Sequence, residues 1–183
     1  APQGAVGVMA GLKVFYEDSL REYDFGPGHP FRGSRFTDFM RFFRENELDR
    51  LLNVEVLPFR PPRPGDEELF KVHSREYVDL VKRMSKTGFG SLSPDTPAFK
   101  GMYEAALNIV HSALSAGRAI LEGDQLAVGF GGLHHAGRDY GEGFCIFNDV
   151  AILARFLQES GLRRVFIFDY DAHQGNGTMD IFY

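Results

Sequence analysis

Residues 164–173 read Arg-Val-Phe-Ile-Phe-Asp-Tyr-Asp-Ala-His, an apolar run that is followed at once by polar side chains. Such a run is typical of a strand inside a parallel sheet, covered on both faces. The same arrangement, an apolar run followed by a polar segment, occurs earlier in the chain. Residues 125–130 are mostly apolar, and residues 131–143 are polar and rich in glycine. Residues 149–159, between the two, have a helical pattern. We therefore predict a βαβ unit, a parallel sheet and the α/β class.

The preceding residues fit the same class. Short apolar runs predict strands at residues 12–16 and 54–57, and amphipathic spacing predicts a helix with Ser34 as its N-cap. Further helices are predicted at residues 66–72, 75–84, 99–121 and 177–183. Residues 1–11 are expected to be an upstream or expression-derived remnant. Residues 12–183 are expected to be the N-terminal part of one domain, because a strand reached this late normally needs further layers to cover it.

The composition excludes several classes of protein. The 183 residues contain 20 Lys+Arg and 25 Asp+Glu, a net charge of −5, and show no basic stripe, so direct binding to nucleic acid is not expected. No apolar run reaches the ~20 residues of a membrane span, and the start lacks a secretory signal pattern. We expect a cytoplasmic protein, either monomeric or oligomeric. The single cysteine, Cys145, excludes an internal disulfide and a Cys-rich zinc site.

Two metal-ligand types follow the last apolar run. Asp171 and His173 are separated by one residue, and alternate residues of an extended backbone point to the same side. A carboxylate and an imidazole that converge in this way favour zinc. Asp169 shares that face, where it can orient a histidine. The alternative interpretation is a polar strand end whose aspartate caps the next helix.

Two adjacent histidines, His134 and His135, follow the other apolar run. Taken alone, such a pair in a glycine-rich loop is more often a plain surface feature. Both polar clusters, however, follow neighbouring predicted strands, where parallel sheets place their ligand-binding cleft. A general base and an electrostatic helper are roles that paired imidazoles can fill. The turn around Asn176 is either near the metal or a plain turn.

The segment between these clusters is expected to line the cleft. Gly143 permits close backbone approach, and Phe144 offers an apolar wall for a narrow channel. Cys145 is interpreted as a small buried thiol rather than a nucleophile. Asn148 or Asp149 is expected to cap the following helix.

Three segments together resemble, in order and spacing, the central signature of the zinc-dependent histone deacetylase superfamily, which includes acetoin-utilisation proteins and acetylpolyamine amidohydrolases. These segments are residues 131–136, 143–149 and 169–177, and pieces near residues 28–35, 70–77 and 95–104 agree. The resemblance extends from Leu12 over nearly the whole chain. It implies an α/β fold of the arginase/deacetylase type, with an open parallel sheet and flanking helices, truncated before its C-terminal strands.

The resemblance also implies a role for each matching residue. Asp171 and His173 match two of three protein ligands of zinc, and the third, an aspartate, is expected beyond residue 183, as is a tyrosine that polarises the substrate carbonyl. His134 and His135 match the tandem catalytic histidines, and Asp169 pairs with the first.

Further matches concern the second histidine and the substrate. Asn176 would hold the second histidine by a neutral amide, and this form looks like that of bacterial, archaeal and class IV members. Gly143 and Phe144 match the acyl-lysine channel, and Asp95 matches a rim residue that holds the substrate backbone. Arg35 matches an arginine near the internal cavity.

The function that this resemblance implies is zinc-dependent hydrolysis of N-acyl amides by metal-activated water. An acetyl-lysine peptide or an acetylated polyamine is the expected substrate, and the sequence names neither the acyl group nor the amine. The 183-residue chain alone is expected to be inactive. The alternative is a fragment that acts only as an interaction module through an uncovered sheet edge.

Overall fold

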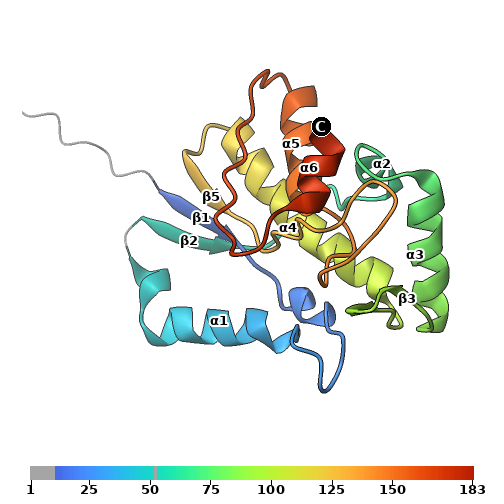
Figure 1. The fold of residues 1–183 in the computed structure, drawn as a ribbon. Coiled ribbons are helices and arrows are strands. Elements are labelled where there is room, and N and C mark those ends of the chain that lie inside the picture. The colour runs from blue at the N-terminus through green and yellow to red at the C-terminus, as the bar shows by residue number, and fades with distance from the viewer. Residues whose placement is uncertain (1–10, 52) are drawn as a thin grey trace, which may run out of the picture.

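The computed structural model describes residues 11–51 and 53–183 and contains a parallel sheet, which lies on the left side of Figure 1. Its three strands, in the order β2-β1-β5, are β1 (Leu12–Phe15), β2 (Val54–Leu57) and β5 (Leu126–Val128). Both outer strands run parallel to β1. The predicted parallel sheet and α/β class are therefore confirmed. Of the predicted remnant, residues 1–10 lie outside the described part of the chain.

Helices flank this sheet, with α1 along the lower side of Figure 1 and α5 and α6 above. The helices are α1 (Ser34–Glu45), α2 (Asp66–Leu69), α3 (Arg75–Thr87), α4 (Met102–Leu121), α5 (Asp149–Glu159) and α6 (Asn176–Phe182), with 3-10 turns η1 (Asp18–Glu22) and η2 (Leu48–Arg50). β3 (Ser91–Ser93) and β4 (Thr96–Pro97) form a small antiparallel pair. Among the described residues, no helix combines the length and apolarity that a bilayer crossing requires.

The long helix α4 carries the centre of the hydrophobic core. It packs against β1, β5, α3 and α5. The side chains of Ala106, Ile109 and Leu114 on α4 are fully buried. A β-carbon at Gly117 would lie 2.5 Å from Leu153 Cδ1 of α5, so this glycine allows the two helices to approach closely.

The start of α1 differs from the prediction. Ser34 is the first residue of the helix and not its N-cap, which is Gly33, and no side chain caps this end. A β-carbon at Gly33 would lie 1.8 Å from the carbonyl oxygen of Arg21. Close packing against the end of η1 therefore determines how α1 begins, and local capping chemistry does not.

The predicted strand at residues 164–168 is wrong, and so is the βαβ unit built on it. This segment has no regular secondary structure between α5 and α6, and it pairs with no strand of the described chain. Phe166 and Phe168 are 87% and 73% exposed. β5 is also less buried than predicted, since Leu126 is 51% exposed and only one of its edges pairs within residues 11–51 and 53–183. An apolar run is buried only where a neighbouring strand and a covering layer exist.

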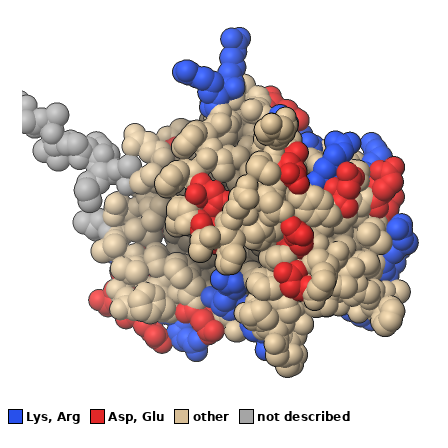
Figure 2. All heavy atoms as spheres, in the orientation of Figure 1, with Lys and Arg blue, Asp and Glu red and all other residues tan. Residues whose placement is uncertain are grey.

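Charged side chains are mixed on the face shown in Figure 2. Lys and Arg lie beside Asp and Glu there, and no continuous basic stripe crosses this face. The sequence contains 20 basic and 25 acidic residues, so neither sign dominates the composition.

The position of α4 predicts unequal costs for two leucines on the same helix. Leu114→Ala should lower the free energy of unfolding by about 2–5 kcal/mol, because it opens a cavity in the core. Leu121→Ala, at the 38% exposed end of α4, should cost less than half as much. Urea denaturation of the two variants measures both values. Equal losses would contradict the core assigned to α4.

Candidate active site

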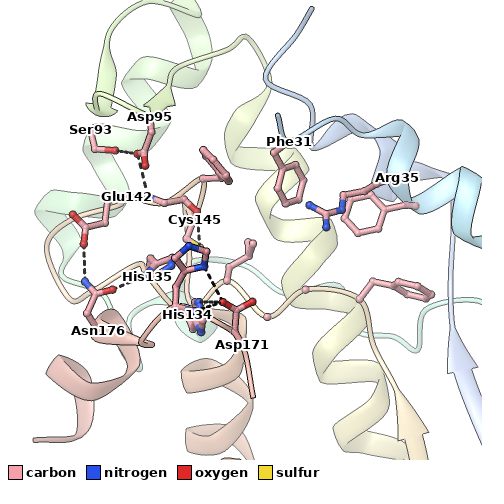
Figure 3. Close-up of a pocket in the computed structure, with 18 of the residues that line it drawn as sticks. Phe31, Arg35, Ser93, Asp95, His134, His135, Glu142, Cys145, Asp171 and Asn176 are labelled. Carbon is pink, nitrogen blue, oxygen red and sulfur yellow. Dashed lines mark hydrogen bonds and ion pairs between the residues drawn. The ribbon is translucent and has the colours of Figure 1, made fainter. Parts of the chain in front are cut away.

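A cavity of about 1200 Å³ gathers residues from distant parts of the chain. Its walls come from α1, the β3–β4 region, the loop after β5, the segment before α5 and the turn before α6 (Figure 3). The candidate residues that line it are Arg35, Asp95, His134, His135, Gly143, Phe144, Asp171, His173 and Asn176. Asp169 lies behind this lining and contacts it through His134. The structure thus brings together every residue that the sequence singled out as a candidate for catalysis, metal binding or substrate binding.

The first histidine is held by a carboxylate. His134 Nδ1 lies 2.5 Å from Asp169 Oδ2, and this hydrogen bond is the main reason that the pKa of the Asp169 carboxyl lies below its ordinary value. His134 is buried, with Nε2 4.0 Å from Asp171 Oδ1. Because an ionised carboxylate only accepts, Nδ1 carries the hydrogen and Nε2 faces the metal-ligand candidates.

The second histidine is held by an amide. His135 Nδ1 lies 2.5 Å from Asn176 Oδ1. Asn176 Nδ2 in turn donates to Glu142 Oε1 at 2.6 Å and to the hydroxyl oxygen of Tyr140 at 3.3 Å. The rings of His134 and His135 meet edge to face, with centroids 4.3 Å apart. Glu142 and Tyr140 were not identified from the sequence, where only their position in the glycine-rich loop marks them.

The two metal-ligand candidates converge as predicted, but the backbone bends at residues 172–173 and is not extended there. Asp171 Oδ1 accepts from the His173 backbone N–H at 2.7 Å and lies 3.1 Å from His173 Nδ1. Two ligands of tetrahedral zinc, each bonded at 2.0–2.1 Å, lie about 3.3 Å apart. The observed separation therefore fits two adjacent ligands of one zinc ion. Within the described residues no cluster of three or more His, Cys, Asp or Glu side chains could hold a metal, so these two donors form an incomplete set.

A buried carboxylate fixes the loop that carries the histidine pair. Asp149 is 4% exposed and accepts hydrogen bonds from the backbone N–H groups of Gly132, at 3.0 Å, and Leu133, at 2.7 Å. Burial raises the pKa of the Asp149 carboxyl, and these N–H groups oppose that rise. Of the two predicted caps, Asn148 is the one that caps α5, since its side chain accepts from the backbone N–H of Ala151 at 2.9 Å. Asp149 is thereby free to hold the loop.

The channel wall is set in a backbone conformation that is rare for a phenylalanine. Phe144 has φ +70°, and its N–H donates to Thr96 Oγ1 at 2.9 Å. The buried hydroxyl of Tyr23 donates to the Phe144 carbonyl at 2.6 Å. Such conformations persist only where the surroundings hold them. Tyr23 and Thr96 are site residues that sequence reasoning missed, because nothing local links them to Phe144.

The rim carboxylate is also anchored. Asp95 accepts hydrogen bonds from Ser93 Oγ at 2.6 Å, Thr96 Oγ1 at 3.0 Å and the Gly143 N–H at 3.1 Å. Burial alone would raise the pKa of Asp95, but these hydrogen bonds outweigh it and hold the pKa below its ordinary value. Asp95 therefore meets a ligand as an anion. Arg35 lies at the opposite side of the cavity, 4.3 Å over the ring of Phe31 (Figure 3).

The cysteine is buried, as predicted. Cys145 is 3% exposed, and burial raises the pKa of its thiol to about 12. A thiol with so high a pKa is a poor nucleophile near neutral pH.

A second buried histidine supports the site from outside the cavity. His73 is 2% exposed, its Nδ1–H donates to the Gly137 carbonyl at 2.8 Å, and its Nε2 accepts from the Asn148 N–H at 3.0 Å. It therefore joins the histidine loop to the start of α5. Burial lowers the pKa of His73 to about 4. In the sequence, His73 lies in the segment 70–77 that agrees with the family resemblance, but nothing local assigns it this role.

Comparison with known proteins places these features in one family. A model of the histone deacetylase domain matches residues 29–183. The acetoin utilization protein AcuC of Staphylococcus aureus strain MSSA476 is 36% identical over 183 residues, which covers 92% of this chain and 45% of that protein. A probable deacetylase of Archaeoglobus fulgidus is 35% identical over 177 residues, which covers 93% of this chain and 47% of that protein.

Solved structures agree with the sequence comparison. The crystal structure of the HDA15 HD domain superposes with a TM-score of 0.81 at 26% identity, and covers 94% of this chain and 50% of that one. The chain thus spans about half the length of the proteins it matches.

The burial of His73 predicts acid sensitivity. Below its ordinary pKa of 6.5, His73 is protonated in the unfolded chain, whereas in the folded protein its pKa is about 4. Stability should therefore fall as the pH drops from about 6.5 to about 4, by about 3 kcal/mol from this residue.

His73→Asn keeps a donor for Gly137 but cannot titrate. Its free energy of unfolding should be lower than wild type near neutral pH, and should change less between about pH 7 and about pH 4. Urea denaturation of the wild type and the variant at several pH values measures how the free energy of unfolding of each depends on pH. The same pH dependence in both proteins would show that His73 does not cause the acid sensitivity.

Proposed function

The chain belongs to the histone deacetylase domain family, and we propose that the full-length protein carrying it is a zinc-dependent deacetylase that hydrolyses the amide of an acylated amine. The observation that supports this most directly is one cavity lined by a carboxylate–imidazole donor pair, Asp171 and His173, and by two oriented histidines. Neither cluster alone is specific, but together they provide a metal position beside a base.

In this proposal, Asp171 and His173 hold the zinc ion, and a further donor comes from outside the described residues. When bound, zinc polarises the acyl carbonyl and lowers the pKa of a water molecule. The 3.1 Å separation of the two donors supports this role, as does the exposure of both side chains toward the cavity.

The two histidines divide the proton transfers. His135 has its hydrogen on Nδ1, facing Asn176, so its Nε2 lone pair is available to accept the proton of the attacking water. His134 donates its Nδ1 hydrogen to the Asp169 carboxylate, which orients the ring with Nε2 toward the cavity. We assign to His134 the stabilisation of negative charge and the protonation of the leaving amine.

The substrate chain is proposed to lie along Gly143 and Phe144, with Asp95 at the rim. Because Phe144 is held by Tyr23 and Thr96, the wall is formed before substrate arrives. The anchored Asp95 carboxylate can accept from peptide N–H groups or attract a cationic amine. An acetyl-lysine peptide and an acetylated polyamine both satisfy this chemistry.

Removal of the proposed base tests the mechanism. In the full-length protein, His135→Ala should lower turnover of an acetyl-lysine peptide by about 10²–10⁴-fold, the usual contribution of a general base. Zinc content should remain, because His135 is not a proposed ligand. His111→Gln, on α4 and outside the cavity, is the matched control and should keep its activity. Near-normal turnover of the His135 variant would refute its role as base.

The incomplete donor set gives a separate expectation for the isolated chain. Catalytic zinc sites use three protein ligands, and the described residues offer two. The 183-residue chain alone should bind zinc substoichiometrically and should not hydrolyse acetyl-lysine peptides. Metal analysis measures the zinc content of the chain, and a peptide assay measures its hydrolysis of acetyl-lysine. Stoichiometric zinc with turnover would show that a third ligand comes from this chain or a second copy.

A further inference from the structure

The side chain of Asn176 lies between His135 and Glu142, and its orientation decides what His135 can do (Figure 3). An amide presents an accepting oxygen at one end and a donating NH₂ group at the other. Here the oxygen faces His135 at 2.5 Å and the nitrogen faces Glu142 at 2.6 Å. The assignment of these two ends therefore rests on which neighbours can donate and which can only accept.

The neighbours of the Asn176 nitrogen are both acceptors. An ionised carboxylate such as that of Glu142 has no hydrogen to donate. The hydroxyl of Tyr140 gives its hydrogen to Asp180 Oδ2 at 2.5 Å, so its oxygen accepts from Asn176 at 3.3 Å. Both NH₂ hydrogens are thus used. The reversed amide would set its oxygen against a carboxylate, leaving two acceptors facing one another.

The amide orientation is transmitted to His135. Because Asn176 Oδ1 accepts, His135 Nδ1 carries the hydrogen, and the lone pair of the neutral ring is on Nε2. A reversed amide would donate to Nδ1, which would move the ring hydrogen to Nε2. His135 would then be unable to accept a proton on the cavity side. His134 needs no such support, since Asp169 is itself a carboxylate.

The backbone around Glu142 is held in place. A β-carbon at Gly141 would lie 2.3 Å from the hydroxyl of Tyr77, and the Gly143 N–H is bonded to Asp95. Both flanking residues are therefore packed closely, and the Glu142 carboxylate is directed at Asn176 by a rigid loop.

We propose that Glu142 is a positioning residue that, with Tyr140, locks the Asn176 amide and so selects the His135 tautomer with a free Nε2. This inference rests on the proposed function for its catalytic consequence. Its structural part, the tautomer of His135, depends only on Glu142, Tyr140 and Asn176 and can be measured without substrate.

The test compares variants of Glu142 that differ in hydrogen-bonding capacity. Glu142→Met removes the acceptor at similar size, and should lower kcat about tenfold or more with KM nearly unchanged. Glu142→Gln retains an acceptor oxygen and should stay within about threefold of wild type. Glu45→Met, at the exposed end of α1, is the matched control and should leave kcat unchanged.

A second background separates positioning from a general structural role. In Asn176→Asp there is no amide to reverse, so adding Glu142→Met to it should no longer lower kcat, and should relieve the repulsion between two carboxylates. A merely structural loss would persist in both backgrounds. If Glu142→Met does not fold, Tyr140→Phe removes the other acceptor and should lower kcat about threefold.

The direct readout is the ¹⁵N NMR spectrum of the His135 ring in the full-length protein. Wild type and Glu142→Gln should show hydrogen on Nδ1, and Glu142→Met or Tyr140→Phe should show a mixture of tautomers. Unchanged tautomer and kcat in both of these variants would overturn the inference while leaving the proposed function intact. A tautomer shift in a protein without deacetylase activity would support the inference and refute the function.

Discussion

The site depends on one buried interaction, the pair of hydrogen bonds that Asp149 accepts from the backbone N–H groups of Gly132 and Leu133. A carboxylate that is 4% exposed must be compensated, and these two N–H groups and the N-terminus of α5 stabilise its charge. The loop after β5 is thereby bound to α5, and the His134 carbonyl accepts from the Thr178 N–H of α6 at 3.0 Å. The two histidines consequently project into the cavity from a backbone held on both sides.

Around this loop, each reactive group has a partner that sets its protonation or direction. The pKa of Asp169 is lowered by His134, and the pKa of Asp95 is held down by three hydrogen bonds. The positive φ of Phe144 is stabilised by Tyr23 and Thr96. Preorganisation of this kind reduces what must be ordered when substrate binds. This preorganisation places several polar groups in the protein interior, where each is destabilising unless its hydrogen-bond partner is present.

Much of the fold could be predicted from periodicity. The strands near residues 12–16 and 54–57 and the helix at 149–159 occur where the pattern places them. The strand predicted at residues 164–168 is wrong because an apolar run indicates only that burial is favourable. A strand also needs a hydrogen-bonding neighbour, and the described residues provide none. The N-cap predicted at Ser34 is wrong for a related reason, since the close contact of Gly33 with Arg21 overrides a local capping preference.

The sequence by itself determined the residues that can do chemistry and one of their local relations. The spacing of one residue was sufficient to bring Asp171 to His173, because that relation spans two residues, but the chain achieves it by a bend at residues 172–173, where Asp171 Oδ1 accepts from the His173 backbone N–H, and not by strand alternation. Only the tertiary structure decided that Glu142 meets Asn176, 34 residues away, and that Tyr23 meets Phe144, 121 residues away. Side-chain hydrogen bonds act over about 3 Å and leave no periodic trace in the chain. They become visible only when the packing of helices and loops has fixed where each donor and acceptor lies.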